Sequence, residues 1–306
     1  MSRPSVIAMT GATGFLGGAL AQRLLQEGHI VRAISRSPAV GLDDRQGIQW
    51  QRGDLADPEA LATLVDGADR VIHAAGILGQ FGIDEATYQR INAEGTRRVL
   101  AAAGAQAAGQ PSTDLRVLHV GSAGVLGPIH DGGDDFAFDE TMPMRPSNAY
   151  ERSKAAAENY AREFALAGLP VVIARPEFVY GPGDLHVLGI FRAVQRGFFF
   201  YVGSGRNHCH PTYIDDAIDG MLACLERGHT GQAYQIAGPR PVSFEELAET
   251  MAAELGVSPP RLHVPRVVAT LGAAGLEVLG RLTGRAVPLS RTGVAFFSES
   301  RRFSIE

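Results

Sequence analysis

Short apolar runs alternate with segments of helical periodicity through the first two-thirds of the chain. In the first helical segment, Leu16, Leu20 and Leu24 recur at the spacing of one helix face. Regular alternation of strand and helix is typical of a parallel sheet whose right-handed crossovers cover both faces. We therefore predict a doubly wound α/β fold, with buried strands at residues 6–10, 30–34, 70–73, 115–120 and 170–174.

The pattern loosens after Arg175-Pro176, where turns rich in glycine and proline separate shorter apolar runs. There the spacing predicts a helix over residues 214–225 and a strand over 234–237. Ser243 precedes another helical segment and is suited to cap its first turn. We expect one domain over residues 1–176 and a smaller C-terminal region over 177–306, of which 206–237 returns to the main sheet.

Composition and charge fit a globular chain of about two domain cores. The chain has 306 residues, of which 45% are hydrophobic and 20% charged. A chain of this length can bury a core large enough to fold without disulfides or metals. With 28 Lys and Arg against 33 Asp and Glu, the formal net charge is −5. The chain therefore lacks the basic surface that neutralises nucleic-acid phosphates, and we expect no nucleic-acid partner.

The cysteines and the longest apolar stretch bear on the compartment. Cys209 and Cys224 lack the spacing of a zinc site, which favours core thiols in a reducing compartment. The N-terminus has no signal-peptide core. The stretch over residues 267–280 is interrupted by Glu277 and is shorter than the roughly 20 residues that cross a bilayer. We expect a cytoplasmic protein without an integral membrane segment; this stretch forms an amphipathic helix over a pocket or subunit face, or else on a membrane surface.

A glycine-rich turn follows the first predicted strand, with glycines at Gly11, Gly14 and Gly17. Glycines there let the backbone turn tightly, approach a pyrophosphate closely and pack the helix against the sheet. The amides and positive dipole end of the following helix favour a phosphate group. Between a first strand and a helix, this motif predicts a Rossmann-type dinucleotide-binding fold.

Further motifs carry a resemblance to a known family. The Gly-x-x-Gly-x-x-Gly spacing and the pair Tyr150-x-x-x-Lys154 resemble the short-chain dehydrogenase/reductase superfamily. A segment similar to the family's serine segment, residues 121–127, precedes that pair. The chain is identified as a member of the extended branch, the NAD(P)-dependent epimerase/dehydratase family, also through residues 71–76, 92–96, 175–183 and 213–216.

The resemblance implies a catalytic triad of Ser122, Tyr150 and Lys154. A tyrosine has a reference pKa near 10, so it needs help to act as acid or base at neutral pH. Four residues apart on a helix, Tyr150 and Lys154 share a face, so the ammonium can lower the pKa of the phenol and bond the nicotinamide ribose. Ser122 can donate a hydrogen bond to the substrate oxygen.

The resemblance also assigns the cofactor site. After the second strand, the acidic residue that would bond a ribose 2′-hydroxyl is replaced by Ser35 and Arg36. We therefore expect NADP, with NAD as the alternative. The expected cofactor-binding residues are Gly11, Thr13, Gly14, Phe15, Leu16, Gly17, Ser35, Arg36, Asp54, Leu55, Ala74, Ala75, Gly76, Tyr150, Lys154, Pro176 and Val179.

Two other groups of residues receive a structural interpretation. By resemblance, Asn92 mainly positions a helix by hydrogen bonding, with a proton relay as the alternative. His208-Cys209-His210 lacks neighbouring ligands at a useful spacing, so we expect no metal site.

Several positions narrow the reaction within the family. Relatives that are sugar dehydratases carry an Asp-Glu pair where this chain has Ala123-Gly124, and nucleotide-sugar epimerases usually carry a phosphate-binding arginine where it has Cys209. The C-terminal part, from Leu262 onward, resembles 3β-hydroxysteroid dehydrogenases and dihydroflavonol reductases. That resemblance implies an apolar substrate pocket built with Phe191 and residues 198–201, and a further tail segment after Glu306.

These inferences predict an oxidoreductase that moves hydride between NADP(H) and a secondary alcohol or ketone. One alternative is a nucleotide-sugar epimerase with retained NAD. A non-enzymatic alternative is an NADP-sensing regulatory protein, which typically lacks the pair formed by Tyr150 and Lys154. The expected partners are a small-molecule substrate and a second copy of the chain, because helices around 87–103 and 150–165 often pair in homodimeric relatives.

Overall fold

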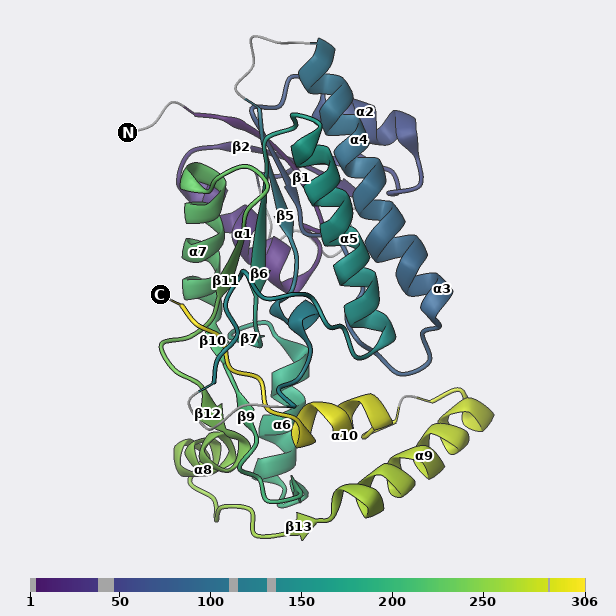
Figure 1. The fold of residues 1–306 in the computed structure, drawn as a ribbon, viewed down its shortest axis with the longest axis vertical. Helices are drawn as coiled ribbons and strands as arrows, with labels where there is room; N and C mark the ends of the chain where they lie inside the picture. The colour runs from purple at the N-terminus through teal and green to yellow at the C-terminus, as the bar shows by residue number, and fades with distance from the viewer. Residues whose placement is uncertain (1–3, 38–46, 110–114, 131–135, 286, 306) are drawn as a thin grey trace.

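A seven-stranded parallel sheet forms the centre of the molecule (Figure 1). The structure is a computed structural model, and it describes residues 4–37, 47–109, 115–130, 136–285 and 287–305. Within them the strands are β1 (Val6–Thr10), β2 (Ile30–Ser35), β3 (Gln49–Arg52), β4 (Arg70–His73), β5 (Arg116–Val120), β6 (Val171–Pro176) and β11 (Ala233–Ile236). They lie in the order β11-β6-β5-β4-β1-β2-β3. The predicted doubly wound α/β fold is confirmed.

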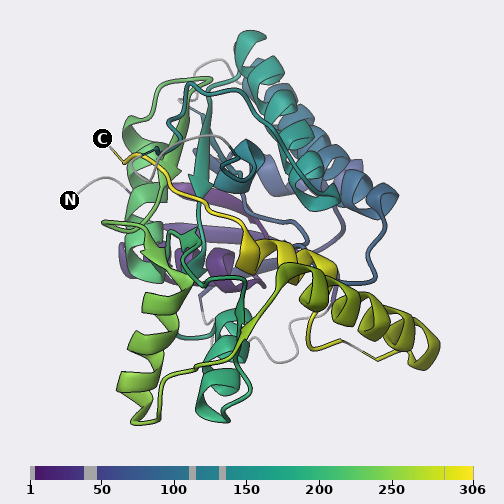
Figure 2. The same cartoon turned by 60° about the horizontal axis from the view of Figure 1, so that its bottom comes forward.

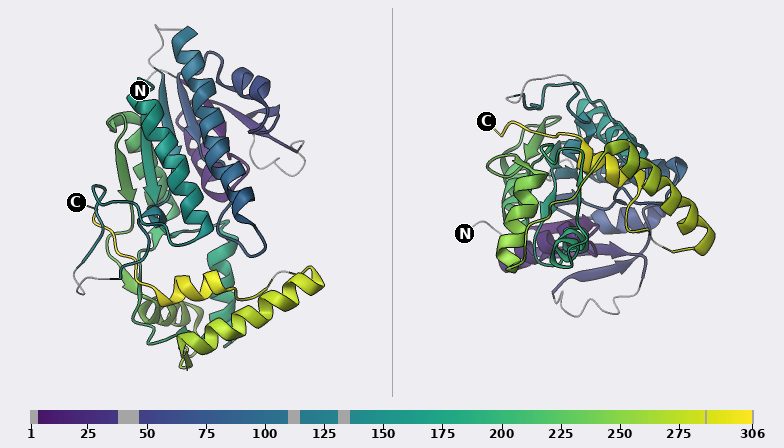
Figure 3. Two further views of the ribbon diagram at one scale, coloured as in Figure 1. Left: turned by 45° about the vertical axis from the view of Figure 1, so that its right-hand side comes forward. Right: turned by 90° about the horizontal axis from the view of Figure 1, so that it is seen from below.

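Helices cover both faces of the sheet because side chains of a strand alternate between its faces. Ile7 and Met9 of β1 pack with α1 (Phe15–Gln26) and α7 (Ile214–Arg227) in one apolar cluster. Ala8 belongs to the opposite cluster, with α2 (Pro58–Val65), α4 (Glu94–Gly109) and α5 (Ala149–Leu166). The two layers of helices are visible in Figures 1 and 3.

Sequence reasoning missed one strand of this sheet. The four residues of β3, Gln49 to Arg52, include a single apolar side chain, Trp50, and pair only with β2 at the sheet edge. An edge strand without a buried face lacks the apolar run by which the other strands were found. Two short helical segments also interrupt the layers, a π-helix (Gln89–Ala93) after α3 (Glu85–Tyr88), and a 3-10 helix (Ala123–Leu126) after β5.

The C-terminal part is built from helices and two-stranded pairs below the sheet (Figure 2). The pairs join β7 (Val179–Tyr180) to β10 (Thr212–Tyr213), β9 (His208–Cys209) to β12 (Val242–Ser243), and β8 (Tyr201–Val202) to β13 (His263–Val264). The helices are α6 (Leu185–Gln195), α8 (Phe244–Leu255), α9 (Arg266–Thr283) and α10 (Arg291–Ser298). No helix in the described part of the chain is long and apolar enough to cross a membrane. The division of the chain at residue 176 stays a prediction.

A buried ion pair joins α5 to the sheet. Glu158 on α5 accepts hydrogen bonds from the Nε and Nη2 atoms of Arg175 on β6, at 2.9 and 2.6 Å. Both side chains are almost fully buried. Buried charges are costly unless they are paired and hydrogen-bonded, so this pair fixes the position of α5 against β6.

Candidate active site

The carboxyl ends of the parallel strands all lie at the same end of the sheet, the end that faces the C-terminal part (Figure 2). Gly11 follows β1, Ala74 follows β4, Ser122 follows β5 and Glu177 follows β6. In open α/β sheets, ligands bind in the crevice outside these strand ends. Most residues predicted to bind the cofactor therefore lie along this one edge.

The glycine turn between β1 and α1 fits a bound pyrophosphate. Gly11 has a φ of +81°, and a Cβ atom there would lie 2.5 Å from the backbone of Ala74 and Ala75. A Cβ at Gly17 would lie 2.3 Å from the carbonyl oxygen of Gly11. The N-cap of α1 is Gly14, a residue without a side chain that could cap the helix. Thr13 and Gly14 are exposed, so an anion can approach the positive end of α1 directly.

Hydrogen bonds hold the loop after β4 beside this turn. The amide of Ala75 donates to Thr10 Oγ1 at 3.3 Å. Asn92 accepts from the amide of Ile77 at 2.8 Å and donates to Ser153 Oγ on α5 at 2.9 Å. Asn92 is buried and so ties the loop after β4 to α5, which favours the structural interpretation of this residue over a proton relay.

The triad predicted from the sequence comes together at the end of β5. Ser122 accepts a hydrogen bond from the amide of Gly124 at 3.2 Å, and its side chain also hydrogen-bonds to Tyr150. Asn148 caps α5, which places Tyr150 in the first turn of that helix. Lys154 lies one turn further on, and its Nζ donates to the carbonyl oxygen of Val120 at 2.7 Å.

Burial shifts the pKa values of both titratable members of the triad. Burial raises the pKa of Tyr150 to about 12, although the hydrogen bond with Ser122 acts in the opposite direction. Burial lowers the pKa of Lys154 to about 8. Both shifts disfavour the charged forms. In this structure, burial therefore has the largest effect on the pKa of Tyr150 and raises it. The lowering of this pKa by Lys154, which we expected from the sequence, stays a prediction.

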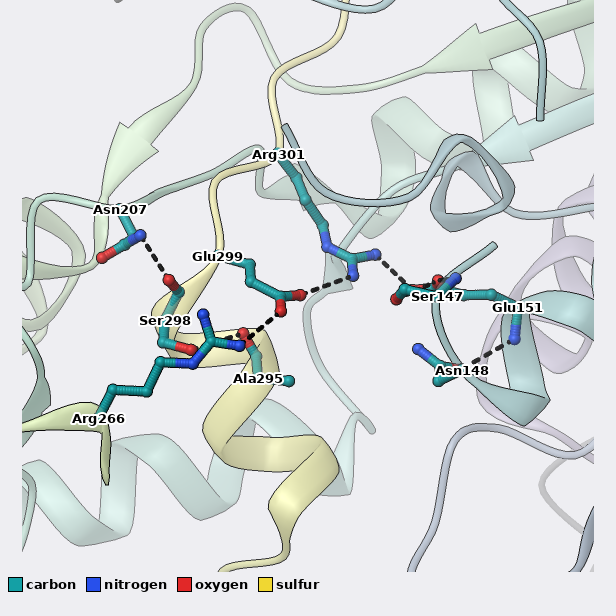
Figure 4. Close-up of polar contacts among 9 residues, drawn as sticks. All are labelled: Ser147, Asn148, Glu151, Asn207, Arg266, Ala295, Ser298, Glu299 and Arg301. Atoms are coloured by element: carbon teal, nitrogen blue, oxygen red, sulfur yellow. Dashed lines mark hydrogen bonds and ion pairs between the residues drawn. The ribbon is translucent and has the colours of Figure 1, made fainter. Parts of the chain in front are cut away.

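The C-terminal segment holds the start of α5, as Figure 4 shows. Glu151, the residue after Tyr150, accepts two hydrogen bonds from Ser147 at 2.7 and 2.8 Å. Its other oxygen accepts from Nη1 of Arg301 at 2.7 Å. Glu299 lies 3.7 Å from Arg301 and 3.0 Å from Arg266. A chain of charges thus runs from α9 to the helix that carries Tyr150.

Glu177 is a buried carboxyl at the same strand edge that sequence reasoning missed. Burial raises its pKa to about 7, although the nearby guanidinium of Arg301 opposes the shift. The negative charge of Glu177 also raises the pKa of Tyr150. The Glu177 carboxyl therefore lies close enough to the Tyr150 hydroxyl to affect its ionisation. The available signal was an acidic residue directly after Pro176, in a segment where the neighbours are mostly apolar.

The residues expected near the adenine ribose lie at the ends of β2 and β3. Arg36 is exposed, and its Nε lies 4.0 Å from Oδ2 of Asp54. Ser35 donates a hydrogen bond to the carbonyl oxygen of Ser37 at 3.0 Å. Leu55, also expected there, is partly buried against α4, since a Cβ at Gly95 would lie 3.0 Å from it.

Pro176 and Val179, which we expect beside the nicotinamide, lie on either side of the segment that holds Glu177 and are partly buried.

His210 is held by the backbone, because its ring forms hydrogen bonds with the carbonyl oxygen of Gly238 at 2.8 Å and with the amide of Phe303 at 3.3 Å. Over the described ranges, no group of three or more His, Cys, Asp or Glu residues is arranged to hold a metal ion.

Comparison with known proteins gives the family. The model of the NAD-dependent epimerase/dehydratase family matches residues 7–237. The chain belongs to this epimerase/dehydratase family. It is 31% identical over 298 residues to the 2-alkyl-3-oxoalkanoate reductase of Stenotrophomonas maltophilia, covering 93% of this chain and 84% of the relative.

A second relative is a 3 beta-hydroxysteroid dehydrogenase/Delta 5→4-isomerase of Mycobacterium tuberculosis, 28% identical over 277 residues, covering 84% of this chain and 71% of the relative. The solved structure of UDP-glucuronic acid 4-epimerase from Bacillus cereus, in complex with NAD, matches with a TM-score of 0.72 at 25% sequence identity. The match covers 85% of this chain and 86% of the epimerase chain. The chain is thus an NAD(P)-dependent enzyme and an oxidoreductase in the broad sense.

The raised pKa of Glu177 predicts a pH-dependent stability. Its pKa rises from 4.5 to about 7 on folding, so between these values the folded chain holds a proton that the unfolded chain has released. The stabilisation that protonated Glu177 contributes to the folded state is fully present below pH 4.5 and is lost as the pH rises toward 7. Relative to Glu177→Gln, the wild type should lose about 3 kcal/mol of unfolding free energy across this range.

Urea unfolding at a series of pH values measures this difference. Glu249→Gln, the same substitution at an exposed position of α8, is the control and should follow the wild type. Equal pH dependence in the wild type and Glu177→Gln would show that Glu177 does not titrate in this way.

Proposed function

We propose that this protein is a reductase that transfers hydride between NADP(H) and a ketone or secondary alcohol, with Ser122, Tyr150 and Lys154 as its catalytic residues. The observation that carries the proposal is the placement of these three residues around the carboxyl end of β5. Ser122 hydrogen-bonds to Tyr150, and Lys154 lies one helical turn beyond it, anchored to Val120.

Each residue has a distinct role in reduction. The bound nicotinamide supplies the hydride. Tyr150, protonated because its pKa is raised to about 12, donates a proton to the ketone oxygen as negative charge develops there. Ser122 donates a hydrogen bond to the same oxygen and stabilises that charge. Lys154 holds the ribose and, as an ammonium beside the phenol, assists proton release from Tyr150 in the reverse reaction.

Aromatic side chains beside the strand edge favour an apolar substrate. Phe178 of the loop after β6 packs edge-on against Phe296 of α10, with ring centroids 5.3 Å apart. Phe296 also contacts Phe244 and Phe297, and Phe297 contacts Phe199. Substrate pockets are mostly lined by such side chains with few polar groups. The reductase from Stenotrophomonas maltophilia is named for a 2-alkyl-3-oxoalkanoate, a 3-keto carboxylate with an alkyl substituent next to the ketone.

The surroundings of Cys209 favour a reductase over a nucleotide-sugar epimerase. Cys209 stands where such epimerases usually carry a phosphate-binding arginine, and it is buried in β9. A thiol cannot replace the planar, charged fork of a guanidinium in holding a diphosphate. The nearby candidates Arg192 and Arg206 are both exposed.

The catalytic role of Tyr150 predicts a large loss of turnover in Tyr150→Phe. The variant keeps the ring but cannot donate the proton, so kcat/KM for NADPH-dependent ketone reduction should fall at least about 100-fold. NADPH oxidation in a panel of alkyl-substituted ketones measures this. Tyr160→Phe, on the same helix but bonded to Glu94, is the matched control. Full turnover by Tyr150→Phe would contradict the assignment.

The cofactor preference depends on Arg36, which is exposed at the end of β2. A guanidinium there can pair with the 2′-phosphate that distinguishes NADP from NAD. Arg36→Ala should weaken NADPH binding about tenfold and leave NADH binding within about twofold, as measured by fluorescence titration. Arg97→Ala on α4 serves as a control for a general charge effect. Unchanged NADPH affinity in Arg36→Ala would rule out this role.

A further inference from the structure

Helix α9 is apolar on two opposite faces. Its inner face packs through Ala269 and Ala273 against Val202 and Val294 in an apolar cluster. Residues 267, 271, 278 and 282 share a second face of the helix. Val267 lies two residues before the buried Ala269, and Leu271 lies two residues before the buried Ala273. Two residues are slightly more than half a turn, so the second face points away from the buried one. A surface helix normally presents polar side chains on its outer face.

The outer face of α9 is strongly exposed. Figure 1 and the left view of Figure 3 show α9 projecting at the lower edge of the molecule, with α10 on its inner side. Six of its aliphatic side chains are 55% to 80% exposed: Val267, Val268, Leu271, Val278, Leu279 and Leu282. Isolated apolar side chains on a surface are ordinary, but a contiguous set on one helix marks an interaction surface.

Arginines lie at both ends of α9, Arg266 at its start and Arg281 in its last turn, whereas the whole chain has a net charge of −5. Residues 257–291 contain five arginines and a single carboxylate, Glu277. Glu277 is buried and bonded to Arg291 at 2.8 Å, so it does not reach the outer face. Arg281 and Arg285 are exposed and make no ion pair with another residue in the described ranges. Because Arg266 is paired with Glu299 and Arg291 with Glu277, the positive charge offered to a partner at this end of α9 comes from Arg281 and Arg285.

We propose that the outer face of α9 docks the protein on a lipid surface that carries anionic headgroups. An amphipathic helix of this kind lies in the membrane interface, with its apolar side chains among the acyl chains and its arginines at the headgroups. The length of α9 and its packing on α10 are compatible with lying on a bilayer, not with crossing one. This inference does not depend on the proposed reductase activity.

The charges argue against a second copy of the chain as the occupant. A two-fold axis that paired α9 with itself would set Arg266 against Arg281 of the other copy in an antiparallel arrangement, or each against its own equivalent in a parallel one. The parallel arrangement brings the two Arg281 charges together beside an apolar contact, and the antiparallel one sets Arg281 against Arg266, whose charge Glu299 only partly offsets. The dimer that we predict from the sequence uses other helices, around 87–103 and 150–165.

Vesicle co-sedimentation of the full chain tests the proposal. The wild type should sediment with phosphatidylcholine vesicles that contain phosphatidylglycerol, and bind about tenfold more weakly to phosphatidylcholine alone or at high salt. The double variant Leu271→Ser/Leu282→Ser should lose at least about tenfold in partition coefficient through lost apolar contact. Arg281→Glu should lose about tenfold through charge.

Leu166→Ser provides the matched control, because Leu166 is 90% exposed at the end of α5 and its loss should leave binding unchanged. Thermal unfolding checks that the exposed substitutions leave the fold intact. Three results would overturn the proposal. One is failure of the wild type to sediment with either vesicle. Another is equal binding by the wild type and the α9 variants. The third is a wild-type dimer in light scattering that Leu271→Ser/Leu282→Ser converts to monomer.

Discussion

Parallel pairing of the central strands is the constraint on which the site depends. Every pairing in the seven-stranded sheet is parallel, so the carboxyl ends of β1, β4, β5 and β6 share one edge. The glycine turn, the loop after β4, Ser122 and Glu177 all follow those ends. Close packing fixes their spacing, since a Cβ at Gly11 or Gly17 would collide with neighbouring backbone. The fold thereby assembles groups that lie more than 160 residues apart in sequence.

Buried charges then fix the helix that carries Tyr150 and Lys154. Glu158 and Arg175 hold the middle of α5 to β6, and Glu151 and Arg301 hold its start to the C-terminal segment. Such pairs add little net stability, because desolvation offsets their attraction, but breaking one leaves a buried charge without compensation. We attribute to them a positioning role. They restrict α5 to the placement in which Tyr150 meets Ser122.

Local patterns predicted much of this arrangement. Apolar runs gave six strands of the sheet because those strands are buried on both faces, and the spacing of Tyr150 and Lys154 gave their shared helix face. The edge strand β3 escaped notice because it is mostly polar. The contact between Glu151 and Arg301 joins positions 150 residues apart, and no local pattern records such a pairing. The apolar outer face of α9 was visible as composition, but its exposure depends on tertiary packing.

The central claim is that the protein exchanges NADP(H) with solvent at each turnover and reduces a ketone. Mass spectrometry of any nucleotide released from the purified protein, followed by NADPH and NADH titration, tests this most directly. We predict protein without retained nucleotide that binds NADPH at micromolar levels and prefers it to NADH. An epimerase returns the hydride to the same substrate and need not release its cofactor. Stoichiometric NAD retained through purification would contradict the account.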